Sequence, residues 1–258
     1  MGAKATYVYC AVQARRKPSF RHLPAGLPGL GKYRLLDASR DLWLVVADAP
    51  LSRYGEEPIR RGLQDMKWLS RCAVGHEAVV EYCLRARAVV PMKLFTIFEN
   101  DFRATREIER RRREIDASMK RVAGRREWGI RIRAVPAAAR ASRRRSGKPA
   151  GGAATGTSYL AGKKQVRDET REMAARAQTR VNRTYSTLAA LAADARRHPP
   201  AIGGEHRTAL LLDAAFLVAI AGTARFRDAA RRAARSLGRD GYGVEVTGPW
   251  PPYNFIEP

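Results

Sequence analysis

Acid–base chemistry has one candidate position in this sequence, the neighbouring pair His76-Glu77. A histidine beside a carboxylate can act as a general acid or base, and a second histidine four residues away would complete a zinc site. No histidine lies at that spacing, so the H-E-x-x-H pattern is absent. The pair also lies beside the apolar stripe of a predicted helix. We therefore interpret His76 as a hydrogen-bonded structural residue.

Two other groups of residues resemble reactive or phosphate-binding sites. Cys10, Cys72 and Cys83 are odd in number and fit no metal-ligand spacing, so we expect buried free thiols. The stretch 151–158 resembles a phosphate-binding loop, but Thr157 stands where such a loop needs lysine and no strand leads into it. The sequence therefore predicts no catalytic residue, no metal, no cofactor and no small-molecule substrate.

The chain is strongly basic, with 49 Lys and Arg against 25 Asp and Glu and a formal net charge of +24. Such a charge is typical of proteins that bind nucleic acid or membrane surfaces, but also of an Arg- and Ala-rich composition. Most arginines alternate with acidic residues, as in 106–110, which indicates a solvated helix face. The alternative function is that of a basic nucleic-acid-binding protein, which would use Arg140, the run 143–145 and the Arg-rich helices.

Length and hydropathy favour a packed fold of two domains. The chain has 258 residues, of which 45% are apolar. No uncharged apolar run is long enough for a transmembrane helix, and the first residues lack the apolar segment of a signal peptide. We therefore expect neither a membrane span nor a secretory signal.

The first part of the chain, residues 1–125, predicts an α+β domain. Runs of β-branched and aromatic residues predict strands, and apolar residues at helical spacing predict helices. Pro91 indicates that the strand containing it lies at an edge or a bulge. The expected elements are strands at 6–12, 33–36 and 42–47, a helix at 57–85, a strand at 88–98 and a helix at 101–122.

Residues 126–247 predict a second domain with a ferredoxin-like sheet. In its first strand, 127–135, Trp128 and alternate residues face the core while Glu127 and its alternates face solvent. The basic and Gly/Ala-rich stretch 139–157 predicts a mobile loop. Strand, helix, strand, helix, strand is the order of a split βαβ fold, although no hairpin partner precedes residue 208. After the loop we expect a helix at 160–197, a strand at 208–218, a helix at 223–237 and a strand at 242–246.

The last residues, 248–258, predict a stiff extended tail that joins the two domains. Proline fixes φ and has no N–H, so the tail should be neither helix nor central strand. Its large aromatic side chains need a groove to bury them, which favours docking on the protein over a frayed end. The residues expected to form this interdomain tail are Pro249, Trp250, Pro251, Pro252, Tyr253 and Phe255.

A set of motifs occurs in order along nearly the whole chain. These motifs are Tyr7-Val8-Tyr9, Trp68, His76-Glu77-Ala78-Val79-Val80-Glu81, the apolar run 90–98, Glu127-Trp128-Gly129-Ile130, Gly156-Thr157-Ser158-Tyr159-Leu160, the apolar run 212–218, and Gly248-Pro249-Trp250-Pro251-Pro252-Tyr253. Taken together, they resemble the gas vesicle protein F/L family, the accessory proteins encoded beside the gas vesicle shell protein. After Pro91, however, Lys93-Leu94-Phe95 stands where the family usually has Arg-Phe-Gly.

The resemblance implies two α+β domains, the second a modified ferredoxin fold with a long extra helical region, held together by the C-terminal tail. It also implies a non-enzymatic role at cytoplasmic gas vesicles, as a minor structural or assembly factor. The implied partners are the small hydrophobic shell protein and other accessory proteins. A shell protein that polymerises through exposed apolar and edge-strand surface needs partners that hold it before assembly. An accessory protein with an exposed strand could do so by adding a strand to it. The candidate contact strand contains Pro91, Lys93, Phe95 and Phe98.

Overall fold

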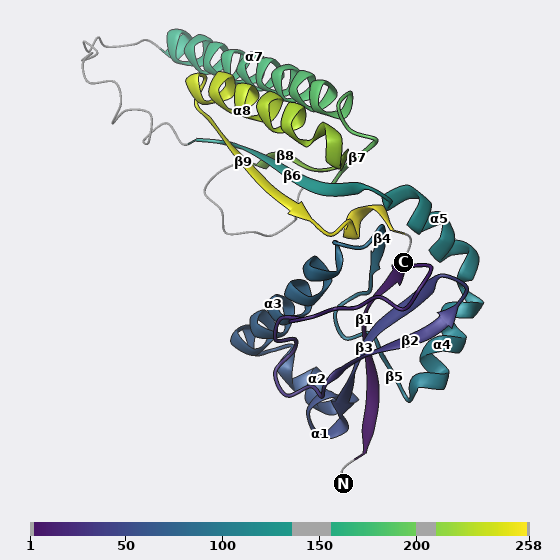
Figure 1. The fold of residues 1–258 in the computed structure, drawn as a ribbon. Helices are drawn as coiled ribbons and strands as arrows, with labels where there is room; N and C mark the ends of the chain where they lie inside the picture. The colour runs from purple at the N-terminus through teal and green to yellow at the C-terminus, as the bar shows by residue number, and fades with distance from the viewer. Residues whose placement is uncertain (1–2, 136–155, 200–209, 257–258) are drawn as a thin grey trace. The chain divides into compact units, whose positions relative to one another are not determined.

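A computed structural model describes residues 3–135, 156–199 and 210–256, and only the backbone of 156–170. The chain divides into two compact units. Unit 1 contains Met1–Glu127 and Pro249–Pro258, and unit 2 contains Trp128–Gly248. Each combines helices with one sheet, so the predicted α+β class is confirmed (Figure 1). The loop predicted at 139–157 lies outside the described residues up to 155, and a helix begins at Gly156.

Unit 1 is built on a five-stranded sheet in which the described pairs are antiparallel. The order is β2-β3-β1-β4, and β5 also pairs with β1. Strands β2 and β3 follow each other in the chain and pair antiparallel as a hairpin. The strands are β1 (Lys4–Gln13), β2 (Tyr33–Ser39), β3 (Leu42–Pro50), β4 (Ala88–Pro91) and β5 (Ile97–Phe98).

Helices cover both faces of this sheet, which explains why β1 is apolar along nearly its whole length. On one face Tyr9 and Val45 pack in the core with Val79 of α3. On the other, Val8 packs with Ile108 of α4 and with residues of α5. The helices are α1 (Leu51–Tyr54), α2 (Glu56–Gly62), α3 (Met66–Cys83), α4 (Asp101–Arg110) and α5 (Arg112–Val122).

A bulge in β1 changes which residues face α3. The register with β3 shifts between Val8 and Cys10, so Tyr9 and Cys10 both join the α3-side core. Strict alternation would have placed Cys10 with Val8 on the other face. The bulge therefore adds Cys10 to the face that Tyr7 and Tyr9 share through normal alternation.

Three predicted elements of unit 1 were wrong in their continuity. The helix predicted at 57–85 is interrupted before α3, because Asp65 accepts hydrogen bonds from two N–H groups and starts a new helix. The strand predicted at 88–98 is two short strands separated by a turn, in which Phe95 has φ of 65°. The helix predicted at 101–122 is broken at Arg111, and Phe102 in its first turn is 65% exposed.

Unit 2 has the strand order β7-β8-β6-β9. With helices after the first and third strands, this order is that of the ferredoxin-like fold. The missing hairpin partner is β7, which pairs antiparallel with β8. The elements are β6 (Arg125–Ala134), α7 (Gly156–Ala189), β7 (Asp194–Arg197), β8 (Leu210–Ala219), the 3-10 turn η1 (Ile220–Gly222), α8 (Thr223–Arg239) and β9 (Tyr242–Trp250).

The helix predicted at 160–197 was therefore wrong at its C-terminal end, because α7 ends at Ala189 and β7 follows it. Residues 194–197 carry no β-branched or aromatic side chain, and they form a strand because β8 offers partners to their backbone. Met173 of α7 is an apolar residue that is 68% exposed. The inward face predicted for β6 is confirmed at Trp128, Ile130 and Ile132, which pack against α7 and α8. Among the described helices, none combines the length and apolar character that a bilayer crossing requires.

Candidate functional site

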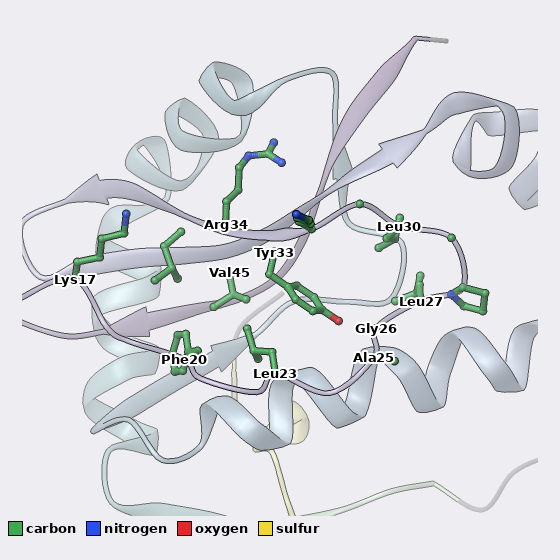
Figure 2. Close-up of a pocket in the computed structure, with 15 residues that line it drawn as sticks. Lys17, Phe20, Leu23, Ala25, Gly26, Leu27, Leu30, Tyr33, Arg34 and Val45 are labelled. Atoms are coloured by element: carbon green, nitrogen blue, oxygen red, sulfur yellow. The ribbon is translucent and has the colours of Figure 1, made fainter. Parts of the chain in front are cut away.

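A groove of about 880 Å³ lies between the loop 17–32 and the edge strand β2 in unit 1 (Figure 2). Tyr33 and Leu35 of β2 and Val45 of β3 face it from the sheet. The loop contributes large apolar side chains from the other side. These loop residues are Phe20, Leu23, Leu27 and Leu30.

Hydrogen bonds to the backbone fix this loop in place. The Tyr33 hydroxyl donates to the Pro24 carbonyl at 2.8 Å, and the Tyr54 hydroxyl donates to the Pro28 carbonyl at 2.6 Å. The Leu27 N–H donates to the Tyr9 hydroxyl at 3.2 Å. A ligand would therefore meet a groove that is already formed, which reduces the entropy lost on binding.

Two glycines allow the loop to approach the rest of unit 1 closely. A Cβ on Gly26 would lie 2.1 Å from the Tyr9 hydroxyl oxygen. A Cβ on Gly75 of α3 would lie 2.5 Å from the Gly26 carbonyl oxygen. The glycines of this region thus serve close packing of loop and helix.

The groove is apolar with a cationic rim. Lys17 and Lys32 are exposed at its edges. Arg34 points to the opposite side of β2 from Tyr33 (Figure 2), where its guanidinium Nη2 lies 2.5 Å from an Asp101 carboxylate oxygen. The hydrogen bonds from Arg34 lower the pKa of Asp101. The lining residues, all in the described chain, include no His, Cys, Asp, Glu or Ser.

The structure assigns different environments to the residues of the candidate contact strand. Pro91 is buried in β4, whereas Lys93 is exposed in the turn after it. Phe95 stacks on Trp68, with ring centroids 5.4 Å apart and planes at 11°. Phe95 and Phe98 together line a second groove, of about 620 Å³. Two of the four residues thus share one surface, and Pro91 does not reach it.

His76 lies in the core between α3 and the sheet and is 3% exposed. Its Nε2–H donates to the Met92 carbonyl at 3.0 Å, and its Nδ1 accepts from the Tyr7 hydroxyl at 2.7 Å. Burial lowers its pKa to about 4, with the Met92 hydrogen bond acting in the opposite direction. A neutral histidine with both ring nitrogens engaged agrees with the structural interpretation.

The C-terminal tail packs within unit 1. Phe255 is completely buried, and Pro251 and Pro252 are buried as well. The backbone N–H of Asn254 donates to a Glu127 carboxylate oxygen at 2.9 Å, and its side-chain amide donates to the other oxygen at 2.5 Å. This docking explains why Glu127, predicted to face solvent, is only 6% exposed.

Two details of the tail differ from the predicted extended strap. Residues Tyr253–Phe255 form a short 3-10 helix, and Trp250 remains 41% exposed at the end of β9.

Two buried groups at the tail have raised pKa values. Burial, followed by the charge of Glu77, raises the pKa of Tyr253. Burial likewise raises the pKa of Glu77.

The groove beside β2 and the carboxylates under the tail were missed from the sequence. One available signal was the loop itself, since four large apolar side chains are too many for a fully solvated segment. Glu127 gave no such signal, because its burial depends on a residue 127 positions later. In the described chain, all three cysteines are free and buried, and no group of three potential ligands is suited to a metal ion.

Comparisons with known proteins agree with this architecture. Gas vesicle protein L of Streptomyces sp. (strain CB03234) is 30% identical over 259 residues, covering 96% of this chain and 91% of that protein. The crystal structure of GvpF from Anabaena sp. PCC7120 superposes with a TM-score of 0.68 at 16% identity, covering 99% of this chain and 97% of that one. GvpF from Microcystis aeruginosa gives a TM-score of 0.65 at 14% identity, with coverages of 98% and 99%.

At such low sequence identity, the two crystal structures show that this chain shares their fold and carry no further argument. The family follows from the sequence, because the profile described as "Gas vesicle synthesis protein GvpL/GvpF" matches residues 5–257. This range includes both units and the tail. The chain therefore belongs to the GvpL/GvpF family of gas vesicle synthesis proteins.

Proposed function

We propose that this chain is a non-enzymatic accessory protein that acts in the cytoplasm during gas vesicle formation. In this proposal it binds the small hydrophobic shell protein and other vesicle proteins. The observation that carries the proposal is the family match, which extends over residues 5–257. His76, the one candidate for acid–base chemistry, is buried and has both ring nitrogens hydrogen-bonded within the protein. This arrangement supports a binding role.

The groove beside β2 is the surface we propose for an apolar segment of the shell protein. Burial of apolar area stabilises such a complex by about 25 cal/mol per Å² before the costs of association are subtracted. In the described sheet β2 is an edge strand, so an extended partner segment could also pair with its backbone. The second groove, at Phe95 and Phe98, is proposed as a further contact.

The tail is proposed to hold the two units together. It is docked in unit 1, and the strand that leads into it is part of unit 2 up to Gly248. The chain therefore passes from one unit to the other at residues 127–128 and again at residues 248–249. The tail would thus act as a clasp through Phe255 and the Asn254–Glu127 hydrogen bonds.

Co-expression with the shell protein tests the proposed function. Affinity capture of the tagged chain should retain the shell protein at moderate salt and still do so when the salt concentration is raised. Loss of the complex on raising salt alone would point to charge attraction. Failure of the wild-type chain to retain any shell protein would contradict the proposal.

The same experiment with a groove variant tests the proposed surface. Leu23→Glu places a charge in the apolar groove and should reduce retention by about tenfold, since an unpaired charge there is costly to desolvate. Phe102→Glu is the matched control, because Phe102 is an exposed apolar residue elsewhere in unit 1. Equal retention by both variants would remove the groove from the proposal. Thermal midpoints of both variants verify that they are folded.

A further inference from the structure

A cationic furrow lies between α7 and α8 in unit 2, with a volume of about 340 Å³. Leu188, Ala229 and Leu237 contribute apolar surface to it. Arg183 of α7 and Arg232 of α8 line it as well and are exposed. The furrow therefore combines an apolar base with guanidinium groups from both helices.

The positive charge in this furrow is only partly balanced. Arg180 also lines it, and its Nη1 lies 2.8 Å from a carboxylate oxygen of Asp240. Within the described part of the chain, Arg183 and Arg232 form no ion pair. Helix α8 carries six arginines and one acidic residue, Asp228, which pairs with Arg231 at 3.4 Å. Clustered charge of one sign attracts a partner of the opposite sign.

We propose that this furrow binds an acidic helical segment of a partner protein. Its carboxylates would meet Arg183 and Arg232, whose planar guanidinium groups can form two parallel hydrogen bonds with a carboxylate. Its apolar side chains would lie against Leu188 and Leu237. The small side chains of Ala229 and Ala233 leave space for the ridge of a third helix.

The lining residues favour a protein over a nucleic acid as the occupant. None of the residues that line the furrow is aromatic, so they provide no surface on which bases could stack. An apolar base is also poorly matched to a phosphate backbone, which prefers polar and charged contacts. The furrow lies in unit 2, so this inference is independent of the groove proposed for the shell protein in unit 1.

A labelled helical peptide tests the inference, with glutamates along one face and alanine and leucine along the other. A scrambled peptide of the same composition lacks the two faces and serves as the probe control. We expect the full chain to bind the amphipathic peptide about tenfold more tightly than the scrambled one. Equal binding of the two peptides, or no binding of either, would overturn the proposal.

Charge-reversal variants locate the binding. Arg183→Glu with Arg232→Glu should weaken binding of the amphipathic peptide about tenfold. The matched control, Arg87→Glu with Arg113→Glu, makes the same change in net charge at exposed positions of unit 1 and should weaken it less than about twofold. Equal weakening by both variants would show that net charge alone is responsible and would overturn the proposal.

Two additional measurements keep the result decisive. First, a single-stranded oligonucleotide is titrated in parallel with the peptide. If Arg183→Glu with Arg232→Glu abolishes binding of the oligonucleotide but not of the peptide, the furrow is a nucleic-acid site instead. Second, if the Glu variant does not fold, Arg183→Gln with Arg232→Gln removes the charges without reversing them. The same order of peptide affinities is expected for that pair.

Discussion

The two units differ in where they place their polar groups. In the described chain, the four polar residues classed as buried are Thr6, His76, Ser118 and Glu127, and all lie in unit 1. The buried core of unit 2 is composed of apolar residues of β6, β8, α7 and α8. Its charges are instead concentrated on helix surfaces, as on α8. Both units have a sheet covered by helices, so the comparison separates the effect of composition from that of architecture.

This difference indicates how each unit is stabilised. A buried polar group is tolerated only with its hydrogen-bond partners, so unit 1 should depend on specific residues and on their protonation states. Unit 2 should depend mainly on apolar packing and be insensitive to single surface charges. The tail belongs to the network of unit 1, because Asn254 bonds to Glu127.

The largest effect is expected for the tail. Phe255→Ala removes a completely buried aromatic side chain and should lower the free energy of unfolding by about 3–5 kcal/mol. Trp250→Ala should cost less, about 1 kcal/mol, because Trp250 is partly exposed. Denaturant titration measures both. A larger loss for Trp250→Ala would mean that the tail docks differently from the structure.

Limited proteolysis then tests the proposed clasp. Truncation after Thr247 should expose the connection near residues 127–128 and give two stable fragments, whereas the wild-type chain should resist cleavage there. Cleavage of both proteins at the same sites and at the same rate would show that the tail does not hold the units together.

A smaller effect is expected from the protonation of His76. The unfolded chain takes up a proton near the ordinary pKa of 6.5, whereas the folded chain does so only near pH 4. Between these pH values the unfolded state binds more protons, so stability falls as the pH is lowered. The loss should approach about 3 kcal/mol at pH 4.

The variant His76→Gln isolates this contribution. Its unfolding free energy should change less than that of the wild type between pH 6.5 and 4, because no imidazole is present to titrate. Glu77 acts in the opposite direction, since its raised pKa favours the folded state as the carboxyl takes up a proton. Parallel pH profiles for the two proteins would show that His76 does not cause the dependence.

Replacement of Glu127 should have a still smaller effect on the free energy of unfolding. Glu127→Ala leaves the Asn254 N–H without its acceptor and should lower the free energy of unfolding by about 1–3 kcal/mol. Arg131→Ala, a change to an exposed residue of the same strand in unit 2, should alter it by less than about 0.5 kcal/mol. Equal effects of the two substitutions would remove the contrast between the units.

The smallest effect is expected for the stretch 139–155. Its Gly-, Ala- and Arg-rich composition offers little apolar area to stabilise a packed structure. Replacement by a short Gly-Ser linker should therefore leave the thermal midpoint of both units nearly unchanged. A large decrease, measured by calorimetry, would show that this composition does contribute to a core.

The sequence predicted most elements whose signal is local. The apolar run that became β1 and the alternating residues of β6 were both recognised because side-chain periodicity reports directly on burial. The family resemblance was likewise carried by local motifs. Element ends were less accurate, since Asp65 and Arg111 interrupt helices whose apolar spacing continues across the break.

Features that depend on distant residues were not predicted. Strand β7 has the composition of a helix end and exists because it pairs with β8. The groove beside β2 depends on hydrogen bonds that join Tyr33 and Tyr54 to a loop without regular periodicity. Glu127 is buried by a tail more than a hundred residues away. Each is a tertiary effect that overrides local propensity.

Site-specific photo-crosslinking tests directly whether the groove beside β2 contacts the shell protein. A photoreactive amino acid is placed at Leu23 in the groove, or at the exposed Phe102 as control, in the chain co-expressed with the shell protein. We expect a crosslink to the shell protein from position 23 and little or none from position 102. Crosslinking from position 102 but not from position 23 would contradict the proposed contact.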